Sequence, residues 1–158
     1  MDAQKQAELL LDQPDWVIDP LPCQVPAGGG GQYFAVEAEW LKEANIIALR
    51  KRFLSVLLKL NCYFDLEVCR AEQDRFIRNP APGELAAWIT EPSGSFLFLL
   101  SSQNSLITLY GGDTYMTVYH PSGSLLTVLE PLVSAEGLFL RRQEKHTEEK
   151  DHGNDQPE

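Results

Sequence analysis

Three tyrosines, Tyr110, Tyr115 and Tyr119, are the residues whose type and spacing most directly suggest an activity. They lie on two short apolar segments joined through glycines, a pattern that predicts a two-stranded ribbon with one apolar face. Tyrosine is enriched at protein interfaces because its ring buries a large area while its hydroxyl keeps a polar tip. We therefore predict that the other face of the ribbon contacts a partner, through Thr108, Tyr110, Tyr115, Thr117 and Tyr119. The competing interpretation is that a helix, such as 43–60, covers this face.

A basic cluster, Arg50-Lys51-Arg52, is a second group that could do chemistry. Three neighbouring cations are able to contact a small anion or a phosphate. On a helix, however, they also form an ordinary solvated face that pairs with the carboxylates of an acidic chain. We expect the solvated face and keep the anion contact as the alternative.

No arrangement in the sequence is typical of nucleophilic catalysis, which needs a base beside the nucleophile and an orienting group behind the base. Cys62 or Cys69 with His120 is the one cysteine–histidine combination before the polar tail, and free cysteines are usually buried apolar residues. A catalytic carboxylate needs burial to raise its pKa, whereas four acids of the predicted strands alternate toward water. They are Glu37, Glu39, Asp65 and Glu67. We predict that the protein is not an enzyme.

Metal and phosphate sites are not expected either. Cys62 and Cys69 have no further cysteine nearby, and His146 and His152 lie in a polar tail that cannot provide the rigid geometry of a metal site. The glycines of 28–31 lack the ordered spacing, the lysine and the following helix of a phosphate-binding loop. We therefore predict no bound metal ion and no cofactor.

The formal net charge of −10 over 158 residues limits the class of partner. Nucleic acids and anionic membranes attract positive surfaces, so we expect neither, and a negative chain is steered toward basic proteins. No run approaches the roughly 20 apolar residues that span a bilayer. The N-terminus lacks the features of a signal peptide, and three cysteines are a poor disulfide framework. These features predict a cytoplasmic location.

The segment 96–119 must hold the tyrosines in place. Its apolar run 96–100 predicts a strand that is buried on both faces. The segments 106–110 and 114–119 then form a hairpin with Gly112-Asp113 as a two-residue loop. In this register Leu109 faces Met116 and Ile107 faces Val118, so that the apolar side chains share one face.

Helices and further strands flank this segment. A helix is expected over 124–134, with a kink or break near Glu130 because Pro131 disrupts a helix interior, and a last strand over 138–140. Another helix covers 43–60 and ends at Asn61 in left-handed geometry, with an apolar stripe on one side. That stripe comprises Ile46, Leu49, Phe53, Val56, Leu57 and Leu60.

The remaining pattern is weaker. It predicts a short helix over 3–11, strands over 16–18, 33–40, 63–70 and 85–90, and a polar connection over 74–83. For 33–40 the alternative is the first turns of the following helix, because glutamate, alanine and leucine are good helix formers. The strand over 85–90 would lead into 96–119 as an antiparallel meander. The Pro- and Gly-rich stretch 22–32 predicts a flexible loop, and the charged tail 143–158 predicts disorder.

Together these elements predict one α+β domain over 1–142. An antiparallel sheet of four to six strands would carry two main helices. The function that fits best is a non-enzymatic, acidic protein-binding module of a bacterial type, such as an immunity-type inhibitor or a chaperone-like adaptor. One alternative is a small-ligand sensor or enzyme with a pocket between the sheet and helix 43–60. Another is a structural homo-oligomer that pairs through a sheet edge.

Overall fold

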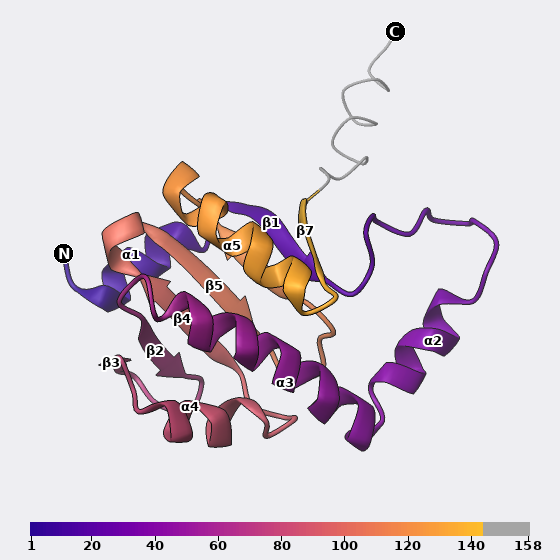
Figure 1. Ribbon diagram of the computed structural model, residues 1–158, viewed down its shortest axis with the longest axis horizontal. Coiled ribbons are helices and arrows are strands. Elements are labelled where there is room, and N and C mark those ends of the chain that lie inside the picture. Colours follow the sequence, from indigo (N-terminus) through magenta and orange to yellow (C-terminus); the bar gives the residue numbers. More distant parts are fainter. Residues whose placement is uncertain (144–158) are drawn as a thin grey trace, which may run out of the picture.

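A seven-stranded antiparallel sheet is the frame of the fold, shown in Figure 1 as a computed structural model that describes residues 1–143. The strand order along the sheet is β3-β2-β4-β5-β6-β1-β7. The strands are β1 Pro14–Asp19, β2 Glu67–Arg70, β3 Phe76–Arg78, β4 Phe96–Leu100, β5 Ser105–Leu109, β6 Met116–Tyr119 and β7 Phe139–Arg142. The α+β class is therefore confirmed, with seven strands in place of the expected four to six.

Five α-helices accompany the sheet in the described part of the chain. They are α1 Ala3–Leu10, α2 Tyr33–Trp40, α3 Glu43–Leu60, α4 Pro82–Ile89 and α5 Gly123–Ala135. Helices α3, α4 and α5 cover one face of the sheet, and α1 packs on the other. Helix α2 projects beyond the sheet at the end of the irregular stretch 20–32 (Figure 1). Among residues 1–143, no helix is both long and apolar enough to cross a membrane.

The main core lies between the sheet and α3, α4 and α5. The predicted stripe of α3 is buried throughout, as expected. It packs against Phe96, Phe98 and Leu100 of β4 and against the apolar side chains of the neighbouring strands. Helix α3 ends at Leu60, but Asn61 has a right-handed φ of −67°, so the left-handed ending was wrong.

The hairpin register was predicted correctly. Ile107 is paired with Val118 and Thr108 with Thr117, and Ile107, Leu109, Met116 and Val118 are all fully buried in the main core. Strict apolar alternation fixes the register because a slip by one residue would expose the whole apolar set. The meander is β4-β5-β6, preceded by a helix in place of the strand expected over 85–90.

Two segments that were predicted as strands are helices. In α4, Pro82 and Glu84 occupy the first turn, where a proline has no hydrogen bond to lose and an acid favours the helix dipole. In α2, alternation of apolar residues was misleading, because alanine and glutamate are good helix formers and no residue of this helix is buried.

Other boundaries also differ. The strand over 63–70 shortens to Glu67–Arg70, and a further strand, Phe76–Arg78, pairs with it inside the expected polar connection. Helix α5 continues through Pro131 to Ala135 without the expected break. Disorder was expected for 143–158, but residues 144–158 lie outside the part of the chain that the structure describes.

Candidate protein-binding surface

The sheet face opposite α3, α4 and α5 is called the open face here, and α1 covers its middle. Ala7 and Leu10 of this helix pack with Leu99, Leu106 and Tyr119 in a second apolar cluster. Tyr119 is only 8% exposed as a result. One of the three predicted contact tyrosines is thus covered by a helix, but the cover is α1 and not the helix 43–60.

Tyr110 and Tyr115 remain accessible at the end of the β5–β6 hairpin. They are 40% and 38% exposed, respectively. Of the two predicted threonines, Thr108 is buried at 1% exposure, and Thr117 is half-buried. Of the predicted contact residues, Tyr110, Tyr115 and part of Thr117 are therefore accessible to a partner in solution.

The turn between these two tyrosines is centred on Gly111-Gly112 and not on Gly112-Asp113. The Asp113 amide donates to the Tyr110 carbonyl at 3.2 Å, and Gly112 has a φ of +89°, which suits the third position of a type II turn. A Cβ atom at Gly111 would lie 2.5 Å from the Ser93 carbonyl oxygen. The turn is thereby packed closely against the segment that precedes β4.

Arg50 lies inside the fold and donates a hydrogen bond to the turn that follows Tyr110. Its guanidinium donates to the carbonyl oxygens of Ile89 at 3.1 Å, Glu91 at 3.0 Å, Gly94 at 2.7 Å and Tyr110 at 3.4 Å. The side chain is fully buried, and this burial lowers its pKa. Arg50 therefore joins the end of α4, the loop before β4 and the tyrosine turn.

The expected solvated basic face of α3 is only partly correct. Arg50 is buried among carbonyl groups and offers no surface to an anion in solution. Lys51 and Arg52 are exposed, so the anion contact that was suggested for the cluster now concerns these two residues alone.

Several carboxylates act electrostatically on Tyr115. The pKa of its phenol is raised by burial and then by Asp113. The pKa of Asp113 is raised by burial and by the charge of Glu37, and these effects outweigh the opposing effect of Arg50. Within residues 1–143, Asp113 forms no salt bridge. Asp19 also adds negative potential here, although it pairs with Arg141. This end of the open face therefore favours an approaching cation.

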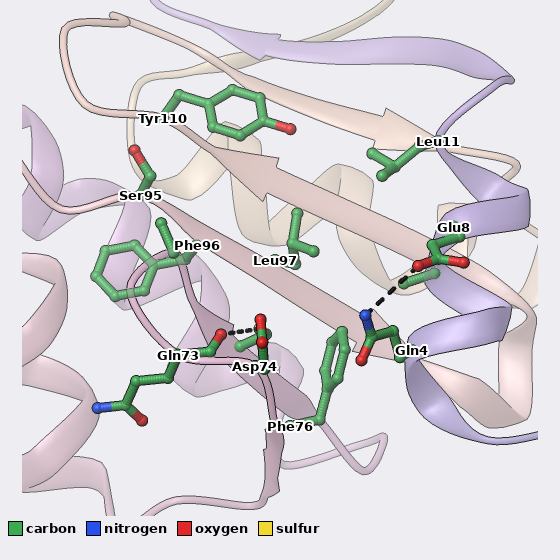
Figure 2. A pocket seen from close by; sticks show the side chains of 13 residues that line it. Gln4, Glu8, Leu11, Gln73, Asp74, Phe76, Ser95, Phe96, Leu97 and Tyr110 are labelled. Carbon is green, nitrogen blue, oxygen red and sulfur yellow. Dashed lines mark hydrogen bonds between the residues drawn. The ribbon is translucent and has the colours of Figure 1, made fainter.

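An apolar groove of about 350 Å³ adjoins Tyr110 on the open face. Figure 2 shows Leu97 at its base, Tyr110 on one side and Phe76 at the opposite end. Helix α1 forms another wall, where Gln4 donates to Glu8 at 3.4 Å. The full lining is Gln4, Ala7, Glu8, Leu11, Cys69, Ala71, Gln73, Asp74, Phe76, Ser95, Phe96, Leu97 and Tyr110.

The cysteines and histidine considered for catalysis have separate partners. The Cys69 thiol donates to the Gln73 carbonyl at 3.3 Å, and the pKa of this thiol is raised by burial and by Asp74. Cys62 is exposed and donates to the Leu58 carbonyl, and His120 contacts the Asn104 carbonyl.

The acids considered for catalysis lie mainly in surface contacts. Asp65 pairs with Arg78, Glu39 with Lys42, and Glu67 accepts from Ser101 at 3.3 Å. In the part of the chain that the structure describes, no three histidine, cysteine or acidic residues are grouped to hold a metal ion. His146 and His152 lie outside the described residues.

The groove and the role of Arg50 were not found from the sequence. A signal for the groove was present, because Leu97 and Leu99 make β4 apolar on the open face as well, and this face must be covered or used for contact. Comparisons with protein-family models, with curated proteins and with solved structures find no match to this chain.

Proposed function

We propose that this chain is a non-enzymatic protein-binding module whose contact surface is the open face around Tyr110 and Tyr115. The observation that carries the proposal is the exposure of these two rings, 40% and 38%, at a turn that is held from beneath by Arg50. A rigid aromatic side chain binds with little loss of conformational entropy, because it has few rotatable bonds to immobilise.

The charge around this surface supports a basic partner. Asp113 and Glu37 both add negative potential at Tyr115, and the whole chain carries a formal charge of −10. Such a field raises the rate of encounter with a positively charged protein and disfavours acidic competitors. An immunity-type inhibitor or a chaperone-like adaptor of a cytoplasmic, bacterial kind is the class of protein that combines these properties.

Pull-down from a native lysate tests the proposal. The variant Tyr110→Ala plus Tyr115→Ala removes both accessible rings, and Tyr63→Ala is the matched control because Tyr63 is 65% exposed after the C-terminal end of α3. We expect the wild type and the control to retain the same partner and the double variant to lose it. The same capture by all three proteins would refute the proposed surface.

A small apolar ligand is the second candidate, favoured by the groove. Its volume of about 350 Å³ lies at the lower end of the range for ligand sites, about 300–1,000 Å³. The space between the sheet and α3, where a pocket was expected, is filled by core side chains such as Phe53 and Leu57. A thermal-shift screen with metabolites tests this candidate: a ligand at a hundred times its dissociation constant adds about 2.7 kcal/mol to stability.

A further inference from the structure

We infer that the groove beside α1 receives an apolar side chain from a basic segment of the partner protein. This inference rests on the proposed protein-binding function and assigns the partner's chemistry. The groove lies on the open face, next to Tyr110, so it is continuous with the tyrosine surface and one bound segment can contact both.

The groove is built for an apolar group. Leu97 forms its base, and Leu11, Phe76 and the ring of Tyr110 surround it (Figure 2). Pockets that enclose whole small molecules begin at about 300 Å³, so about 350 Å³ admits one large aromatic or aliphatic side chain. Filling it with such a side chain removes apolar surface from water on both partners.

The negative charges at the groove favour a partner that carries a cationic residue next to the inserted side chain. Glu8 on α1 and Asp74 in the loop between β2 and β3 are the charged residues of the lining, which contains no lysine, arginine or histidine. Both side chains belong to exposed residues, and Asp74 raises the pKa of the Cys69 thiol inside the groove. A lysine or arginine on either side of the inserted residue would therefore meet a carboxylate.

A second copy of this chain fits the groove poorly. Within residues 1–143, α2 is a helix with exposed apolar side chains, among them Phe34, which is 81% exposed. However, α2 also carries Glu37 and Glu39, and two chains of formal charge −10 repel each other. Charge complementarity therefore favours a basic partner over self-association.

Fluorescence anisotropy with two labelled synthetic peptides tests the inference. The peptides have equal length and equal positive charge, one composed of leucine and lysine and the other of serine and lysine. We expect the wild type to bind the leucine peptide at least tenfold more tightly, since burial of a leucine side chain is worth that much in affinity. Equal affinity for the two peptides would overturn the inference, because charge alone would then explain binding.

Two variants with matched controls locate the binding. Ala71→Trp fills the groove, and Ala135→Trp places the same ring at the exposed end of α5. We expect the first to weaken binding of the leucine peptide at least tenfold with no change for the serine peptide, and the second to change neither. Unaltered binding by a folded Ala71→Trp protein would contradict the inference.

A charge-reversal variant provides an independent test, which remains valid if Ala71→Trp fails to fold. Glu8→Lys plus Asp74→Lys acts at the groove, whereas Glu84→Lys plus Glu130→Lys makes the same change of net charge at exposed positions of α4 and α5. We expect the groove variant to bind the leucine peptide about tenfold more weakly than its control. An equal loss in both would show that only net charge matters and would refute the assigned site.

The lysate experiment separates this inference from the proposed function. If Tyr110→Ala plus Tyr115→Ala loses the partner and Ala71→Trp retains it, the tyrosine surface stands and the groove inference fails. If neither variant loses the partner, both fail.

Discussion

Replacement of Arg50 by methionine is predicted to destabilise the fold strongly. The side chain is fully buried and donates to carbonyl oxygens of four residues, three of them within 3.1 Å. Hydrogen bonds from a charged donor contribute about 1.5–3 kcal/mol each, so the three shorter bonds give roughly 5–9 kcal/mol. Burying the guanidinium costs several kcal/mol, and methionine avoids this cost. The net loss should be about 3 kcal/mol.

Urea unfolding measures this loss. With an m-value of about 2 kcal/mol/M, a loss of about 3 kcal/mol lowers the midpoint by roughly 1.5 M. Arg52→Met, an exposed substitution two residues away, should change stability by less than about 0.5 kcal/mol. An Arg50→Met protein that unfolds at the same urea concentration as Arg52→Met would refute the assigned role of the arginine.

Two more predictions concern the turn and the pH dependence of stability. Gly111→Ala should destabilise the protein by about 1–3 kcal/mol, because its Cβ would lie 2.5 Å from the Ser93 carbonyl oxygen. Gly30→Ala is the control, since a Cβ there meets nothing within 4 Å. Equal urea midpoints for the two variants would contradict the close packing at Gly111. The Ser55 hydroxyl, more than any other group, lowers the pKa of Glu136, so this acid stabilises the fold above the ordinary carboxyl pKa of 4.5 and less as pH falls through its lowered value. Glu136→Gln should therefore lose stability relative to wild type at neutral pH, with the difference shrinking in acid; a difference that is independent of pH would contradict the assignment.

The hairpin was predictable from sequence because its alternation is strict over both strands. Every residue predicted to be apolar and inward is fully buried, including Leu109 and Met116. The expected two-residue loop at Gly112-Asp113 was wrong: β5 ends at Leu109 and β6 begins at Met116, so the connection spans 110–115, and its turn has Gly111-Gly112 at the centre. Gly111 also lies so close to Ser93 that a Cβ atom there would be 2.5 Å from the Ser93 carbonyl oxygen, and no pattern within the hairpin reveals this contact.

The burial of Arg50 could have been predicted from its position in the sequence, but its charge led us to place it on the solvated face. It lies four residues after Ile46 and three before Phe53, so helical spacing places it within the apolar stripe of α3. A charged residue in such a stripe needs buried acceptors. Here these are the carbonyl oxygens at the end of α4 and the loop before β4, which no local pattern reveals.

The groove and the cover over Tyr119 depend on where α1 docks. The sequence indicates that β4 is apolar on both sides, but it does not say which helix covers the second face. Helix α1 covers Leu99, Leu106 and Tyr119 and leaves Leu97 only partly covered. The remaining space is the groove, so it arises from the docking position of one short helix.

Site-specific photo-crosslinking in cells tests whether Tyr115 contacts a protein partner. A photoreactive phenylalanine analogue at Tyr115 is compared with the same analogue at Tyr63, which is more exposed at 65%. We expect a discrete crosslink to a basic protein from position 115 and none of that mass from position 63. Identical crosslinking from the two positions, or none from position 115, would contradict this expectation.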